Sequence, residues 1–305
     1  MLSLASLSLT LRFGEAELPG WLGSAMRGGF GQHLRRIVCY RPLHECESCG
    51  QAGECLYYET FERPCSRRGY APPPRPIVLV PPFFGRRVTF RKEGRVEVGL
   101  LLLGRSVRNF PHVLLALQQF GFHGLGEGRY FGRNRFEVER ATCRFSNRVV
   151  FDGGVIHPDR LRTLDVAQIA KVRGSRFRVH FRTPIELPLG FPPSPEHLLG
   201  LIRQRLLLLV NEYGTGEEVP GFSCRGSVRP GSGHRHRLVG YSQRSGRREF
   251  WNCWTGLADY DFEELDENGR WLLGVGRVLG AGAKSSFGMG FFDLTPRRAV
   301  VREGA

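Results

Sequence analysis

Lysine is scarce in this chain. It occurs only at Lys92, Lys171 and Lys284, although lysine and arginine together number 44 and the formal net charge is +15. Arginine has a planar guanidinium that binds two phosphate oxygens at once and stacks on bases. A genome that prefers arginine codons explains arginine in place of lysine, but it does not explain a surplus of basic over acidic residues. The charge therefore predicts a polyanionic partner, most simply nucleic acid.

Long apolar runs are also absent. A membrane helix needs about 20 apolar residues, and no stretch of the sequence approaches that length. Residues 1–13 alternate polar and apolar side chains without a basic start, unlike a signal peptide. We therefore expect a cytoplasmic protein with no membrane partner. In that compartment its eight cysteines indicate metal binding or free thiols more than disulfides.

The hydrophobic pattern repeats the same order of elements in the two halves of the 305 residues. Periodicity and helix-end residues predict, in the first half, a strand over 3–13, a helix over 19–38, strands over 77–80 and 87–103, a helix over 107–120 and a strand over 134–140. The second half gives a strand over 176–187, a helix over 195–213, strands over 238–243 and 249–257, a helix over 270–279 and a strand over 291–294.

This order predicts an α+β protein of two tandem ferredoxin-like (RRM-like, βαββαβ) domains. The first domain should span residues 1–140 and carry a cysteine-rich insert at about 39–65. Residues 141–175 have a polar, glycine-containing composition and should form a linker with little core of its own. The second domain should span 176–305 and contain a glycine-rich loop.

The glycine-rich loop is the most specific motif in the sequence. It consists of Gly280, Gly282, Lys284, Ser285, Ser286, Gly288 and Gly290 with the residues between them. Glycine permits positive φ and lets the backbone approach a phosphate, so successive N–H groups can form an anion nest. A Walker A loop is excluded because Ala283 stands where glycine must precede the lysine, and a dinucleotide fingerprint lacks its long βαβ context. On the residues alone, an anion-binding loop and a set of tight structural turns both remain open.

The loop and several other blocks resemble a known family. Segments 270–276 (RWLLGVG) and 284–291 (KSSFGMGF) resemble the terminal signature of CRISPR repeat-processing endoribonucleases of the RAMP superfamily. Segments 26–31 (MRGGFG), 55–58 (CLYY) and 181–184 (FRTP) fit the branch with an N-terminal four-cysteine insert. The resemblance implies a tandem ferredoxin-like fold and an enzyme that binds CRISPR repeat RNA. It also implies cleavage without metal, by attack of the ribose 2′-hydroxyl, which gives mature guide RNA.

Two other functions remain open. The glycine signature also occurs in non-cutting relatives, so the chain could instead be a non-catalytic RNA-binding subunit of a CRISPR effector complex. In either case its partners would be CRISPR repeat or guide RNA and other effector subunits. A zinc-dependent enzyme acting on another polyanion is the third reading.

RNA cleavage of this kind needs a base, an acid and cations near the phosphate. Histidine is the natural base, and relatives place a catalytic histidine in the first helix, so the resemblance makes His33 the catalytic candidate. The match is one of place and residue type, and a surface histidine on a basic helix is the alternative. The RNA-binding candidates are the loop residues above together with Arg27, Arg35, Arg36, His234, Arg235, His236 and Arg237, of which the last four lie in a basic segment expected to be flexible.

Four cysteines lie within seventeen residues at Cys39, Cys46, Cys49 and Cys55. Four thiolates around a Cys-x2-Cys turn are typical of a closed structural zinc site, which leaves no position for catalytic water. His44 or Cys65 could replace one ligand. An iron–sulfur cluster needs the same thiols, and free thiols are the remaining alternative. We expect structural zinc and no catalytic metal.

Overall fold

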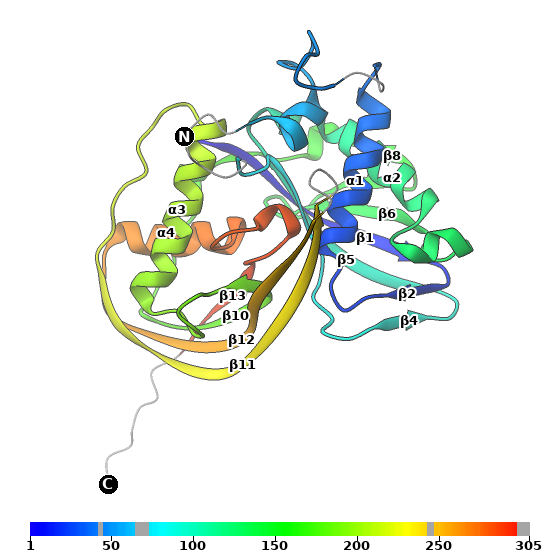
Figure 1. Ribbon diagram of the computed structural model, residues 1–305. Helices are drawn as coiled ribbons and strands as arrows, with labels where there is room; N and C mark the ends of the chain where they lie inside the picture. Colours follow the sequence, from blue (N-terminus) through cyan, green and yellow to red (C-terminus); the bar gives the residue numbers. More distant parts are fainter. Residues whose placement is uncertain (42–44, 65–72, 243–246, 298–305) are drawn as a thin grey trace. The chain divides into compact units, whose positions relative to one another are not determined.

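The computed structural model describes residues 1–41, 45–64, 73–242 and 247–297 (Figure 1). The chain divides into two compact units. The first unit contains 1–168, 208–217 and 284–288, and the second contains 169–207, 218–283 and the C-terminal residues from 289. Within the described ranges, no helix is long and apolar enough to cross a membrane.

The first unit is built on an antiparallel sheet in the order β3-β5-β1-β6. Its main elements are β1 (Ser3–Phe13), α1 (Gly23–Val38), β3 (Ile77–Val80), β5 (Gly94–Leu103), α2 (Phe110–His123) and β6 (Phe136–Cys143). A small second sheet pairs β2 (Ala16–Leu18) with β4 (Val88–Phe90). The chain order β1-α1-β3-β5-α2-β6 is βαββαβ, the order of a ferredoxin-like domain. Strands 3–13 and 77–80 match their sequence predictions to the residue.

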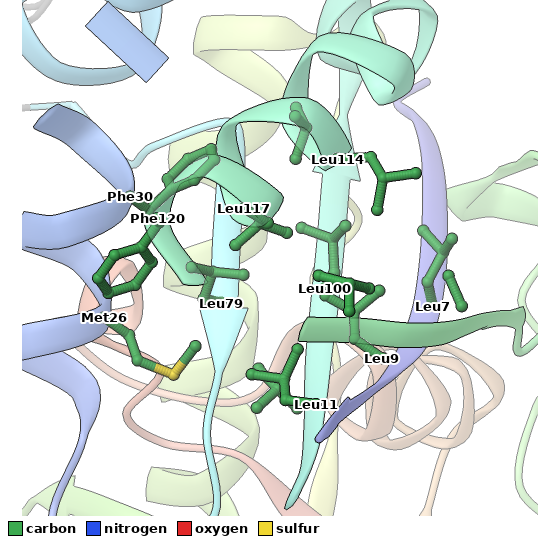
Figure 2. Packing of buried hydrophobic residues seen from close by; sticks show 14 of the residues in the cluster. Leu7, Leu9, Leu11, Met26, Phe30, Leu79, Leu100, Leu114, Leu117 and Phe120 are labelled. Carbon is green, nitrogen blue, oxygen red and sulfur yellow. The ribbon is translucent and has the colours of Figure 1, made fainter. Parts of the chain in front are cut away.

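The core of this unit lies between the sheet and its two helices. Leu7, Leu9 and Leu11 point to one face of β1 and are buried, as period-two alternation requires (Figure 2). The glycines of α1 do not disrupt the helix, although glycine has a low helix propensity. A Cβ at Gly29 would lie 2.1 Å from Cε2 of Phe120 on α2, so this glycine allows the two helices to approach closely.

Residues 141–175 differ from the expected linker. β6 continues to Cys143, and β7 (Val149–Asp152) and β8 (Val155–Ile156) extend the same sheet. β9 (Leu164–Asp165) pairs with the start of β1. Val150 and Phe151 are buried in the core of the first unit. The average polar composition of this stretch hides a few apolar residues that are concentrated on short strands.

The second unit contains a four-stranded antiparallel sheet in the order β11-β12-β10-β13. Its elements are β10 (Arg176–Glu186), α3 (Pro195–Tyr213, of which residues 195–207 belong to this unit), β11 (Cys224–Ser242), β12 (Arg247–Leu265), α4 (Glu267–Leu279) and β13 (Phe292–Pro296). The order is again βαββαβ, so the predicted fold class of two tandem ferredoxin-like domains is confirmed. α3 begins at Pro195 and ends at Tyr213 as predicted. α4 starts three residues earlier than expected because Asp266 caps it by accepting a hydrogen bond from the Gly269 N–H.

The basic segment 229–237 is not a flexible loop, contrary to the sequence expectation. It belongs to β11, which pairs with β12 as a long hairpin coloured yellow to orange in Figure 1. The pairing shifts register between Pro230 and Ser232, where a bulge accommodates the proline. The glycine, proline and charged residues of this segment are typical of a loop, which is why the sequence predicted one. The ladder to β12 supplies the backbone hydrogen bonds that local composition does not predict.

Candidate functional site

His33 lies on the buried face of α1 and is only 4% exposed, so it is not a surface histidine. Its Nδ1 donates a hydrogen bond of 2.8 Å to the carbonyl oxygen of Gly29. Because a carbonyl only accepts, this bond fixes the proton of the neutral ring on Nδ1 and leaves the lone pair on Nε2. Nε2 is buried and has no hydrogen-bond partner among the described residues. The imidazole is therefore held with its basic nitrogen unused.

A second histidine lies beside His33. The ring of His123, in the last turn of α2, has its centroid 4.8 Å from that of His33. His33 also stacks on Phe120 of the same helix α2, with ring centroids 5.6 Å apart. Burial lowers the pKa of His33, and the nearby His123, Arg36 and Arg129 lower it further. His33 is thus neutral at neutral pH.

Exposed aromatic rings and guanidinium groups surround the end of α2. Phe122, Tyr130 and Phe131 are 67%, 72% and 79% exposed. The guanidinium of Arg129 lies 4.7 Å from the ring centroid of Tyr130, and that of Arg135 lies 5.6 Å from Phe122. Aromatic faces interleaved with arginine are typical of surfaces that stack the bases of single-stranded nucleic acid.

The three candidate arginines of α1 have different environments. Arg27 lies over two rings, 4.6 Å from the centroid of Phe287 and 5.6 Å from that of Phe61. The guanidinium of Arg35 lies 5.5 Å from the ring centroid of Tyr57. Arg36 is exposed, and its charge acts on His33. Arg36 is therefore the best placed of the three to meet a phosphate near the histidines.

The glycine-rich loop contributes to both units. Lys284–Gly288 belongs to the first unit, where a Cβ at Gly288 would lie 2.6 Å from the carbonyl oxygen of Leu79. In the second unit a Cβ at Gly290 would lie 1.9 Å from the carbonyl oxygen of Ala281. These glycines are buried and have positive φ, so close backbone packing requires them. Of the RNA-binding candidates in the loop, Gly282, Lys284, Ser285 and Ser286 are partly exposed.

The long hairpin of the second unit forms one wall of an open groove of about 630 Å³. Arg235, Asn252, Trp254 and the half-exposed Phe250 line it together with residues 186–190. We call this feature the hairpin groove. Arg237 points to the same face, because side chains alternate along a strand, and its guanidinium lies 4.5 Å from the ring centroid of Phe250.

His234 and His236 lie on the opposite face of β11 from these arginines. His234 is exposed, whereas Nε2 of His236 forms a 2.8 Å hydrogen bond with Oγ1 of Thr255. The structure therefore separates the four basic residues 234–237 into two pairs. Tyr260, another aromatic of β12, is buried and donates from its hydroxyl to the carbonyl oxygen of Pro193.

The four cysteines of the insert are all partly buried free thiols. Burial raises the pKa of the Cys46 thiol, and Cys39 and Cys55 are close enough to raise it further. Within the described ranges, no three or more His, Cys, Asp or Glu side chains are grouped to hold a metal ion. The alternative ligands His44 and Cys65 lie outside the described residues. The zinc site remains a prediction from the cysteine spacing.

Two family models match the chain in tandem. AF_1859_N, an N-terminal domain, matches residues 2–162, and AF_1859_C, a C-terminal domain, matches residues 177–294. The chain belongs to the AF_1859 family. A protein of Archaeoglobus fulgidus, described as uncharacterized, is 36% identical over 296 residues, which cover 96% of this chain and 98% of that protein.

Solved structures share the fold of this AF_1859 protein. Thermus thermophilus Cas6 superposes with a TM-score of 0.52 at 16% identity and covers 97% of this chain and 99% of its own. A Cas6 product complex has the same TM-score at 17% identity, with 95% and 99% covered. At these identities the likeness shows the fold, which is the tandem ferredoxin-like arrangement of this family member.

Sequence reasoning alone missed part of the site in this AF_1859 protein. It selected His33 but not His123, because their contact depends on how α1 packs against α2. It also did not select Asn252 and Trp254, which line the hairpin groove. The sequence did contain a signal for this surface. Phe250, Asn252 and Trp254 alternate with period two and so share one face of β12, and Asn252 and Trp254 pair across the strands with Arg237 and Arg235.

Proposed function

We propose that this protein binds CRISPR repeat RNA and cleaves it as a metal-independent endoribonuclease, which gives mature guide RNA. The observation that carries the proposal is the pair of His33 and His123 beside exposed arginine and aromatic side chains. The fold, shared with a Cas6 product complex, and the net charge of +15 support the same conclusion.

The chemistry is a transfer of the phosphodiester within one nucleotide. The 2′-oxygen forms a bond to the adjacent phosphorus, and the bond from phosphorus to the 5′-oxygen breaks, which leaves a cyclic phosphate and a 5′-hydroxyl. A base takes the proton from the 2′-hydroxyl, and an acid gives a proton to the leaving 5′-oxygen. No redox partner is needed.

In this proposal the histidine pair takes up the proton of the 2′-hydroxyl and returns it to the leaving 5′-oxygen, so that the protons balance. His33 is neutral and holds an unused lone pair on Nε2, so it acts as the proton acceptor of the pair. His123 is exposed, and its Nδ1 donates to the carbonyl oxygen of Gln119. We assign His123 to the contact with the RNA, because His33 itself is buried. Arg36 and Arg129 then stabilise the charge that develops on the phosphate.

RNA binding extends over the predicted basic residues and the hairpin groove. Arg235 and Arg237 would contact phosphates, and Phe250 and Trp254 would stack bases. Lys284, Ser285 and Ser286 would add donors from the partly exposed part of the glycine-rich loop. Structural zinc on Cys39, Cys46, Cys49 and Cys55 would hold the insert together without taking part in the reaction.

The test is cleavage of a labelled repeat RNA in the presence of a chelator. We expect His33→Ala to slow cleavage far more than it weakens RNA binding. His112→Ala is the matched control, because His112 is exposed on α2, and this variant should cut normally. A His33→Ala protein that cuts at the wild-type rate would show that the catalytic assignment is wrong.

The burial of His33 favours one other function, a non-catalytic RNA-binding subunit of a CRISPR effector complex. Such a subunit would bind guide RNA and other effector subunits and leave the labelled repeat intact under every condition. Loss of cleavage on chelation would instead indicate a zinc-dependent enzyme.

A further inference from the structure

Arg205 is a buried cation in the second unit. It lies on α3 and is only 5% exposed, with its guanidinium 5.0 Å from the ring centroid of Phe291. Its Nε and Nη1 atoms are buried and have no hydrogen-bond partner among the described residues. Arg203, two residues earlier, has a different environment: its Nε and Nη2 donate to the carbonyl oxygens of Pro220 and Val219 at 2.8 and 3.1 Å.

The burial of Arg205 is unfavourable in the free protein. Burial lowers its pKa to about 9, and no carboxylate of the described residues opposes this shift. The side chain therefore remains charged at neutral pH, with no counter-ion in the part of the chain that the structure describes. Buried polar groups are almost always hydrogen-bonded, and a buried charge is normally paired. An arginine left in this state is typical of a site that a ligand completes.

The guanidinium lies against the start of the glycine-rich loop. A Cβ at Gly280 would be 2.9 Å from Nη1 of Arg205 and 2.7 Å from the carbonyl oxygen of Gly290. Gly280 also has a φ of +78°, so a side chain there is excluded by both space and conformation. The absence of a side chain at this position is what brings the backbone of the loop next to the guanidinium.

The same turn has unused backbone donors. The N–H groups of Gly282 and Ala283 make no hydrogen bond within the described ranges. Gly282 is partly exposed and has a φ of +74°, and Ala283 is exposed. Backbone N–H groups beside positive-φ glycines bind anions, and an arginine fork matches two oxygens of a phosphate.

We propose that Arg205 and the turn Gly280–Ala283 bind one phosphate group of the RNA backbone. The identity of the ligand rests on the proposed function, whereas the phosphate chemistry rests on the donors themselves. Phosphate fits this set because it offers several anionic oxygens to a guanidinium and two N–H groups. The phosphate supplies the counter-charge that residues 1–41, 45–64, 73–242 and 247–297 do not give to Arg205.

The experiment uses Arg205→Met in the full-length protein, because methionine fills a similar volume without charge. Arg277→Met, on the exposed part of α4 in the same unit, makes the same change in net charge and is the control. Inorganic phosphate should raise the melting temperature of the wild type and of Arg277→Met more than sodium chloride of equal ionic strength does. Arg205→Met should lose this response. Without phosphate it should melt at or above the wild-type temperature, because an unpaired buried charge has been removed.

RNA binding gives a second measurement. Arg205→Met should bind repeat RNA about tenfold more weakly. Its affinity should also depend less on salt, by about 0.7 in the slope of log K against log salt, since one phosphate contact to a single strand is lost. Arg205→Lys keeps the charge but not the fork, and should retain only part of the phosphate response.

The opposite results would overturn the site. Arg205 would be a structural residue if two results occurred together. Arg205→Met would melt lower than the wild type or fail to fold, and Arg205→Lys would respond to phosphate as the wild type does. A wild type without any phosphate response would exclude the site directly. The proposed function is judged separately: a wild type that shows the Arg205-dependent phosphate response but neither binds nor cuts repeat RNA keeps the site and loses the RNA assignment.

Discussion

The first helix of each ferredoxin-like unit carries a buried basic side chain with unused nitrogens: His33 on α1 and Arg205 on α3. Burial lowers the pKa of both. An imidazole starts near neutrality, so a lowered pKa makes His33 neutral and able to accept a proton. A guanidinium starts far above neutrality, so with a pKa of about 9 Arg205 stays charged. The first helix of the fold thus carries a proton acceptor in one unit and a fixed cation in the other.

The neighbours of the two side chains also differ in whether they can exchange protons. His33 lies beside a second titratable ring, that of His123. Arg205 lies beside an aromatic ring and glycine backbone, none of which titrates. We infer that proton transfer is confined to the first unit, whereas Arg205 in the second unit serves only to bind. Changes around His33 should therefore alter the cleavage rate or the pH dependence of stability, and RNA affinity much less.

The largest expected effect is that of His123→Ala. If His33 and His123 act as one unit, removal of either should lower the cleavage rate by about 10²- to 10⁴-fold, the usual contribution of general acid–base catalysis. The double variant should be hardly slower than either single variant, since residues that act together are not additive. Single-turnover cleavage of labelled RNA measures the rates, and a filter-binding assay should show a much smaller loss of RNA affinity than of rate. Effects of the two substitutions that multiply would instead mean that the histidines act separately.

A smaller effect is expected from the packing that supports His33. Gly29→Ala places a Cβ 2.1 Å from the Phe120 ring, which itself stacks on His33. Overpacking of this kind should lower the free energy of unfolding by about 1–3 kcal/mol, and it should slow cleavage because the imidazole shifts.

Gly28→Ala is the matched control for this change. It lies one residue earlier on the same helix, and a Cβ there meets nothing within 4 Å. It should stabilise the helix by up to about 1 kcal/mol and leave the rate unchanged. Urea denaturation of both variants makes the comparison, and equal stabilities would contradict the close contact between α1 and α2.

The sequence could predict the features that a local residue pattern determines, but not those that depend on tertiary packing. Strand β1 was predictable because one face of period two is buried, and α3 because Ser194 and Pro195 mark its start. His33 could be selected from its place in a helix, but its partner His123 lies ninety residues away and depends on tertiary packing. β11 is longer than the predicted strand, because its partner strand β12 supplies hydrogen bonds that its own composition does not indicate.

Arg205 left a signal that composition alone does not reveal. Three buried residues share its face of the helix. Leu198 lies seven residues before Arg205, Ile202 three before it, and Leu209 four after it. An arginine in register with such a stripe must be buried as well. Its lack of a partner, by contrast, depends on the three-dimensional arrangement around it and is not written in the local sequence.

The smallest expected effect concerns pH and the first unit alone. The pKa of His33 is lowered in the folded state, so below about pH 6.5, the ordinary histidine value, the unfolded chain binds a proton that the folded chain does not. His33 therefore contributes stability that is fully present above this pH and is lost as the pH falls toward its folded pKa, by at most about 1.4 kcal/mol per pH unit.

His33→Phe, which keeps a ring against Phe120, should lose this part of the acid sensitivity, whereas His112→Phe should keep it. Urea denaturation between pH 5 and 7.5, in buffers of equal ionic strength, measures the difference. Parallel pH profiles for wild type and His33→Phe would mean that the buried imidazole titrates like an exposed one, and the distinction between a proton acceptor in the first unit and a fixed cation in the second would then be lost.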